Sequence, residues 1–188
     1  MKRSIYAIAL ITLSATILFS SCAQNKGNSD AQAAAKVFVE QLYTVTTSDV
    51  ETFNSLNSAK PDNDDTDSIK KAEENAKNLT DKLNSKFKTL VTDDEMTSLI
   101  KNTTYTQIVK PASTLKCQLK PKDVVIDNEE VNDNTYKYNY TIKIIIDTAG
   151  AGEKQIATES GIVQVEKTGG KWLANYVTRI KTSELLTK

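Results

Sequence analysis

Two carboxylates of the predicted sheet, in the C-terminal half of the chain, are the candidates for acid–base chemistry. Asp147 follows Ile144-Ile145-Ile146, and Glu159 lies inside the next alternating segment. A carboxylate in apolar surroundings has a raised pKa and can abstract a proton, as a general base must. The chain has no histidine and no nucleophile motif such as Gly-x-Ser-x-Gly. We therefore expect no catalytic residue, and acid–base chemistry through Asp147 is the alternative.

Aromatic side chains recur at every second position just before Asp147. Aromatic rings with a polar tip suit a ligand pocket or a protein interface. The alternative is ordinary core. The candidate ligand or partner face consists of Tyr136, Tyr138, Tyr140, Asp147, Trp172 and Tyr176. With 24 basic and 24 acidic residues, the chain has no general attraction to nucleic acid.

An acidic segment matches part of a calcium-loop template. Asp62, Asp64, Thr66 and Glu73 take its positions 1, 3, 5 and 12, but Asp67 stands where the loop needs glycine. Acidic residues also stabilise the N-terminus of a following helix. We favour this helix-capping role and expect neither a metal nor a cofactor.

The N-terminus has the three parts of a secretory signal. Lys2 and Arg3 precede an apolar run, Ile5 to Phe19, and small Ser20 and Ser21 follow. Fifteen helical residues reach about 22 Å, short of the roughly 30 Å hydrocarbon core of a membrane. We expect residues 1–21 to be a signal peptide.

The stretch Phe19-Ser20-Ser21-Cys22 resembles the bacterial lipoprotein lipobox, with Phe where Leu is usual. The resemblance implies that Cys22 carries a diacylglyceryl thioether with palmitate-type chains and that residues 22–30 form a lipidated tether. Two acyl chains give stable attachment, so we expect a membrane-anchored protein facing outside the cytoplasm. Of the 24 basic residues 22 are Lys, which favours a Gram-positive surface. Cys117 alternates with apolar residues and is expected in the core, the alternative being a disulfide with Cys22.

The rest of the chain, residues 31–188, predicts one α+β domain with its helices first. Apolar spacings of three and four predict helices in the region 31–102. The expected helices are Ala31 to Val45, Asp49 to Leu56 after a Ser48–Glu51 capping box, Ser68 to Val91, and a short helix after a Thr92–Glu95 capping box.

From residue 103 to residue 181 the apolar period is two, which predicts a four-stranded antiparallel meander. Gly161 marks an expected bulge, and Gly169-Gly170 a hairpin turn. Trp172, Ala174, Tyr176 and Ile180 should share one face of the last strand. Strands this long must twist and curl, and the helix over 68–91 has the length to lie across the concave side.

This layout resembles the nuclear transport factor 2-like (cystatin-like) superfamily. The resemblance rests on the Ala34-Phe38-Leu42 helix, the short helix after it, and Gly169-Gly170-Lys171-Trp172-Leu173. It implies helices that cover a strongly bent sheet to form a cone, and it does not fix the function. We expect a non-catalytic module that binds a protein partner at the cell surface, the alternative being a small-ligand pocket in the cone.

Overall fold

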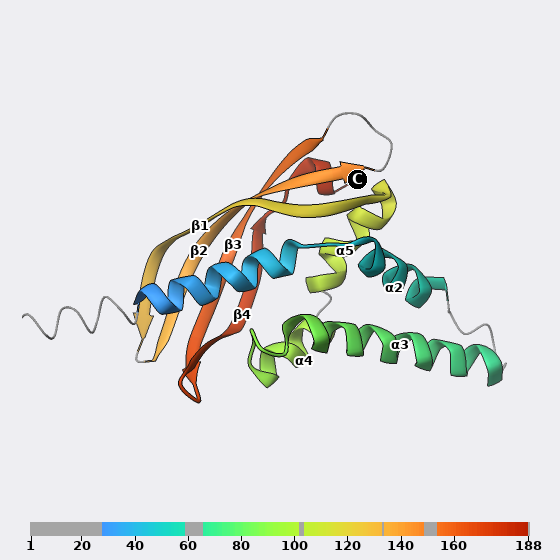
Figure 1. The fold of residues 1–188 in the computed structure, drawn as a ribbon, viewed down its shortest axis with the longest axis horizontal. Coiled ribbons are helices and arrows are strands. Elements are labelled where there is room, and N and C mark those ends of the chain that lie inside the picture. The colour runs from blue at the N-terminus through green and yellow to red at the C-terminus, as the bar shows by residue number, and fades with distance from the viewer. Residues whose placement is uncertain (1–27, 59–65, 102–103, 133, 149–153, 188) are drawn as a thin grey trace, which may run out of the picture.

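The computed structural model describes residues 28–58, 66–101, 104–132, 134–148 and 154–187. Within them the fold is α+β, as predicted, with the helices preceding a four-stranded sheet (Figure 1). A first helix covers residues 28–43. The remaining elements are α2 (Thr47–Ser58), α3 (Thr66–Phe87), α4 (Asp93–Lys101), α5 (Thr104–Leu115), β1 (Cys117–Asn132), β2 (Thr135–Thr148), β3 (Gln155–Thr168), β4 (Lys171–Lys181) and the 3-10 turn η1 (Glu184–Leu186).

The sheet is an antiparallel meander in the order β1-β2-β3-β4, and Figure 1 shows its strands strongly bent. Bending needs irregularities, and the β3–β4 register shifts at Ser160/Gly161 because β4 has an extra residue, Ile180, between Arg179 and Lys181. The bulge predicted at Gly161 was therefore wrong: Gly161 pairs with Tyr140 in an unbroken β2–β3 register and keeps the alternation of β3. Gly169 and Gly170 have φ values of 58° and 80°. Two left-handed residues fit a tight hairpin turn whose twist matches the strands, and the predicted turn is confirmed.

The helix that covers the concave face is the first one, and the prediction that the long helix lies there was wrong. Residues Phe38 and Leu42 of the first helix are fully buried against the sheet. Helix α3 lies apart from the strands in Figure 1. Only its last turns, with Leu83 and Phe87, enter the core. The start of α3 stays outside, because Ile69 is 44% exposed.

Helix α5 occupies a segment predicted to begin the sheet. Its buried residues fall at helical spacings: Tyr105, Ile108, Val109 and Ala112. Pro111 lies inside it and removes the donor that would bond the carbonyl of Gln107. Arg179 Nη1, from β4, donates to that carbonyl at 3.3 Å. Arg179, 72 positions from Gln107, therefore compensates for the donor that the proline removes, which local periodicity could not reveal.

The cap of α2 also differs from the prediction. The box is Thr46–Asp49, two residues before the expected Ser48–Glu51. Asp49 N donates to Thr46 Oγ1 at 3.3 Å, and Thr46 N donates to Asp49 Oδ2 at 2.7 Å. At α4 the predicted cap exists in part, because Glu95 N donates to Thr92 Oγ1 at 3.2 Å.

Short extended segments cover part of both sheet edges. Val45 pairs antiparallel with Leu119 of β1, and Val91 pairs parallel with Ala174 of β4. Such cover satisfies edge N–H and C=O groups that would otherwise invite pairing with another chain. These two bridges also fix the ends of the first helix and of α3 relative to the sheet.

Candidate binding site

The predicted tyrosine row on β2 is part of the core. Tyr138 and Tyr140 are each 1% exposed. The Tyr136 ring stacks on Tyr138 at 6.1 Å and meets Trp172 edge-on at 5.1 Å. The Tyr138 hydroxyl donates to Asn28 Oδ1 of the first helix at 2.9 Å. The first helix thus covers the concave side, and Tyr138 and Tyr140 lie in the core and not on the surface.

A buried polar network surrounds Tyr140. Its hydroxyl lies 3.1 Å from that of Tyr43. Beside it Glu159, fully buried, accepts two hydrogen bonds from Arg179, at 2.9 Å from Nε and 2.6 Å from Nη2. A bidentate pair matches the guanidinium fork to the carboxylate. The second candidate carboxylate of the sheet is therefore held in an ion pair within the core.

Trp172 and Tyr176 do not share a face. The β3–β4 register shifts between Gln164 and Val165, which places an extra residue in β4. Tyr176 is consequently 48% exposed, and Ile180 is 65% exposed, whereas Ala174 is buried. The predicted common face was wrong because a one-residue bulge reverses the alternation beyond it.

Asp147 lies far from the tyrosines, at the other end of β2. Its Oδ2 accepts from Lys120 Nζ at 2.8 Å and lies 3.8 Å from Lys154 Nζ. The hydrogen bond from Lys120 lowers the pKa of Asp147. Acid–base chemistry through Asp147, the alternative expected from the sequence, requires a raised pKa. This geometry therefore does not favour proton abstraction by Asp147 at neutral pH.

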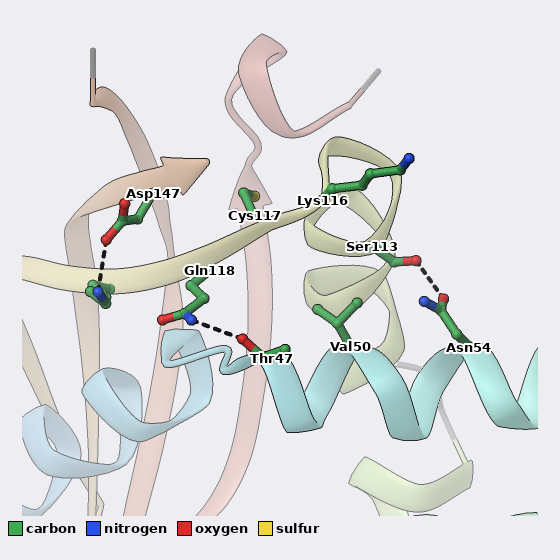
Figure 2. A pocket seen from close by; sticks show the side chains of 9 residues that line it. Thr47, Val50, Asn54, Ser113, Lys116, Cys117, Gln118 and Asp147 are labelled. Atoms are coloured by element: carbon green, nitrogen blue, oxygen red, sulfur yellow. Dashed lines mark hydrogen bonds and ion pairs between the residues drawn. The ribbon is translucent and has the colours of Figure 1, made fainter. Parts of the chain in front are cut away.

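Asp147 instead borders a hollow of about 370 Å³ between β1, α2 and α5 (Figure 2). Four of the polar side chains that line this hollow form hydrogen bonds with one another. Ser113 Oγ donates to Asn54 Oδ1 at 2.6 Å, and Gln118 Nε2 donates to Thr47 Oγ1 at 2.9 Å. The full lining is Thr47, Val50, Asn54, Ser113, Lys116, Cys117, Gln118, Lys120 and Asp147.

A second hollow, of about 590 Å³, lies on the other side of the contact between α2 and α5. The two hollows share Asn54 and Ser113, so the hydrogen bond between these residues forms the ridge between them. The second lining is Phe53, Asn54, Leu56, Asn57, Thr106, Gln107, Lys110, Ser113 and Thr114. We call the two hollows together the α2–α5 groove.

Helix α2 is held by polar contacts, which leaves its apolar side chains in the groove. Its only buried residue is Asp49. The Asp49 carboxylate accepts from Tyr105 Oη at 2.7 Å and lies 3.7 Å from Lys86 Nζ. Val50, Phe53 and Leu56 are only partly buried. Val50 and Phe53 pack against the core on one side, and their accessible parts line the groove together with Leu56. Apolar surface beside polar groups is typical of a binding surface.

Charges in the Asp49 cluster are shifted by their surroundings. Burial would raise the pKa of Asp49, but Lys86 and the hydrogen bonds from Thr46 and Tyr105 outweigh it and lower that pKa. Burial lowers the pKa of Lys86 to about 8, against the attraction of Asp49. Lys86 Nζ also donates to the carbonyl of Thr44. These contacts tie α2, α3 and α5 to the first helix.

Cys117 is a free, buried cysteine at the wall of the first hollow. This confirms its expected place in the core. Burial raises the pKa of its thiol, which keeps it protonated and weakly nucleophilic. Cys22, the predicted lipidation site, and the acidic loop around Asp64 lie outside the described residues. No helix among the residues that the structure describes is long and apolar enough to cross a membrane.

The groove residues were missed in the sequence, apart from Asp147. Lys110, Lys116 and Lys120 are three of 22 lysines, and nothing in their spacing separates them from the others. Phe53 and Leu56 did signal an apolar side of a short helix. That this side would remain uncovered depends on where α5 lies.

Comparison of the sequence with known protein families found no match. Comparison with curated proteins found none either. Among solved structures, the intermembrane space region of the chloroplast protein ARC6 aligns with 55% of this chain and 78% of its own, at 12% identity and a TM-score of 0.33. A TM-score this low does not establish a shared fold.

Proposed function

We propose that this protein is a lipoprotein anchored through Cys22 on the outer side of a cell membrane. Its domain would be a non-catalytic binding module that holds a protein partner in the α2–α5 groove. The lipobox-like Phe19-Ser20-Ser21-Cys22 supports the anchor. The first helix over the bent sheet is in keeping with the resemblance to the nuclear transport factor 2-like superfamily.

The half-covered α2 is the observation that carries the binding role. In the described part of the chain, the concave side of the sheet is packed by the first helix and by Tyr138 and Tyr140, which belong to the hydrophobic core. The groove outside the cone is lined by Val50, Phe53 and Leu56, which are partly accessible, beside hydrogen-bonding side chains. Apolar surface rimmed by polar groups is the usual composition of an interface.

A small ligand in the first hollow is the second candidate. Its volume of about 370 Å³ lies within the range of small-molecule sites. A thermal-shift screen of the full chain against metabolites would support it, since a ligand at 100 times its Kd adds about 2.7 kcal/mol. Absence of any shift would leave the protein-binding role in place.

The anchor is tested by metabolic labelling with palmitate in cells that express Cys22→Ala. We expect the label to vanish and the protein to leave the membrane fraction or keep its signal. Cys117→Ala is the matched control and should stay labelled. Normal cleavage with full membrane retention of Cys22→Ala would contradict lipidation.

The binding role is tested by photo-cross-linking on intact cells. A photoreactive residue at Asn57, in the groove, should yield a specific protein adduct. The same residue at Thr158 on the outer face of the sheet should not. Adducts at both positions, or at neither, would reject the groove as the binding site.

A further inference from the structure

We infer that the α2–α5 groove takes an extended, acidic segment of a partner protein, an inference that rests on the proposed binding role. The groove follows one side of α2 from Thr47 to Asn57. Ten helical residues correspond to about 15 Å. An extended chain advances about 3.3 Å per residue, so the groove matches a segment of about five residues.

The floor of the groove supplies apolar contact at spaced points. Val50 lines the first hollow, and Phe53 and Leu56 line the second. Between them Asn54 and Ser113 form the ridge, bonded to each other at 2.6 Å. A segment that crosses this ridge can place one apolar side chain in each hollow. Its backbone can meet the Asn54 and Asn57 amides on the way.

The charge of the lining favours carboxylates on that segment. Lys110, Lys116 and Lys120 face a single lining carboxylate, Asp147. Asp147 is already paired with Lys120 and with Lys154. In the described part of the chain, neither Lys110 nor Lys116 forms an ion pair. The whole chain is balanced at 24 basic and 24 acidic residues, so the excess is local.

The backbone conformation of Lys116 is independent evidence that the groove uses a lysine side chain at this position. Its φ is 51°, and no other non-glycine residue of the described chain has a positive φ. It follows α5 directly, at the position where glycine usually ends a helix. A lysine in the left-handed region is strained, and strained residues that persist tend to lie at functional positions.

An anionic membrane surface would also attract lysines, but the shape of the site argues against it. Val50 lies between α2, α5 and β1, as Figure 2 shows, and Phe53 and Leu56 line a hollow between α2 and α5. A flat bilayer could reach the lysines and not the floor. A narrow polypeptide segment can reach both.

The probe is a labelled, end-blocked hexapeptide of alternating Glu and Leu, compared with versions that carry Gln or Lys in place of Glu. Binding to the full chain in detergent micelles is followed by fluorescence anisotropy. We expect the acidic peptide to bind at least tenfold more tightly than the Gln version, and the difference to shrink with salt. The Lys version should not bind.

The groove variant is Lys110→Gln with Lys116→Gly. Glycine at 116 relieves the strain, so the melting temperature should stay unchanged or rise, while acidic-peptide affinity falls about fivefold or more. The control is Lys70→Gln with Lys71→Gln, two exposed lysines of α3, and it should bind within twofold of the unchanged protein. Loss of affinity without loss of stability separates a binding role from a structural one.

Four results would overturn the inference. Equal binding of acidic and basic peptides, or unchanged binding by the groove variant, would reject acidic recognition while cross-linking at Asn57 could still support the groove. If the groove variant no longer binds phosphatidylglycerol vesicles but still binds the acidic peptide as the unchanged protein does, the lysines bind a membrane surface and not a peptide. No peptide bound at millimolar concentration, together with no adduct at Asn57, would reject the proposed function as well.

Discussion

Gly161 lies where β3 closely approaches Tyr140 and the backbone of β4. A Cβ at this position would lie 2.1 Å from the Thr178 carbonyl oxygen and 2.5 Å from Tyr140 Oη. Neither neighbour can move without breaking the sheet or the Tyr43–Tyr140 contact. The glycine is therefore required by close approach and not by its backbone angle.

Gly161→Ala should destabilise the protein by about 2–3 kcal/mol through overpacking. Chemical unfolding followed by circular dichroism measures the change. Gly169→Ala is the control, since nothing lies within 4 Å of its Cβ and only its φ of 58° is strained; it should cost about 1 kcal/mol. Equal losses in the two variants would contradict the close-approach explanation.

Arg179 combines two tasks at one position. It neutralises Glu159 inside the core, and it donates to the Gln107 carbonyl that Pro111 leaves without its helical donor. It is one of two arginines in the chain. A lysine there would supply a point charge but not the planar fork that serves both acceptors.

Arg179→Leu should cost about 3–5 kcal/mol, because it leaves the Glu159 carboxylate buried without its cation. The double variant with Glu159→Leu should recover a large part of that loss. Urea unfolding of both variants and of Glu159→Leu forms the cycle. A double variant no more stable than Arg179→Leu would show that the two side chains are not coupled.

Among the elements, helix α4 has an incomplete capping box, and this lowers the free energy of unfolding when Glu95 is ionised. In a complete box the Glu95 carboxylate would accept from Thr92 N. Thr92 N instead donates to the Ala174 carbonyl at 2.9 Å, as part of the edge bridge to β4. Glu95 is 4% exposed, and burial raises its pKa to about 7.

Stability should therefore fall as pH rises through this range. The folded state holds the Glu95 proton between pH 4.5 and about 7 more tightly than the unfolded state, so the stabilisation is full below pH 4.5 and lost above pH 7. The change in the free energy of unfolding that Glu95→Gln causes should be more favourable at pH 8 than at pH 4, by on the order of 3 kcal/mol. Unfolding curves at both pH values measure it, with exposed Asp94→Asn as the charge-matched control. Equal effects of Glu95→Gln at the two pH values would refute the raised pKa.

Across the whole molecule, buried tyrosines join the first helix to the sheet and α5 to α2. Tyr43 and Tyr140 meet hydroxyl to hydroxyl across the two layers, and Tyr105 reaches Asp49. Burial raises the pKa of Tyr140 to about 12, and it raises the pKa values of Tyr43 and Tyr105 as well. Ionisation of these three hydroxyls therefore opposes the fold.

Alkaline unfolding should follow from these raised pKa values. Because the unfolded chain loses tyrosine protons from about pH 10, the contribution of the three hydroxyls is present below pH 10 and is lost above it. Absorbance at 295 nm should show a late cooperative step that coincides with loss of near-ultraviolet circular dichroism. Tyr176→Phe, at an exposed position, should leave that step in place. A gradual titration with the dichroism retained would contradict the buried network.

The sequence by itself determined the local and periodic features of this protein. The period of two over β2 and β3 and the Gly169-Gly170 turn follow from side-chain alternation and from glycine conformation, which act between near neighbours. The α+β class follows from the order of these segments.

Only the tertiary structure decided what depends on distant residues. Helix α5 tolerates Pro111 because Arg179 supplies a donor from β4, and the tyrosines became core because the first helix, and not α3, covers the concave face. The α2–α5 groove exists because Asp49 fixes α2 by polar contacts while α5 leaves Val50, Phe53 and Leu56 partly uncovered. Packing between elements far apart in the chain determines these features, and local sequence propensity does not predict such packing.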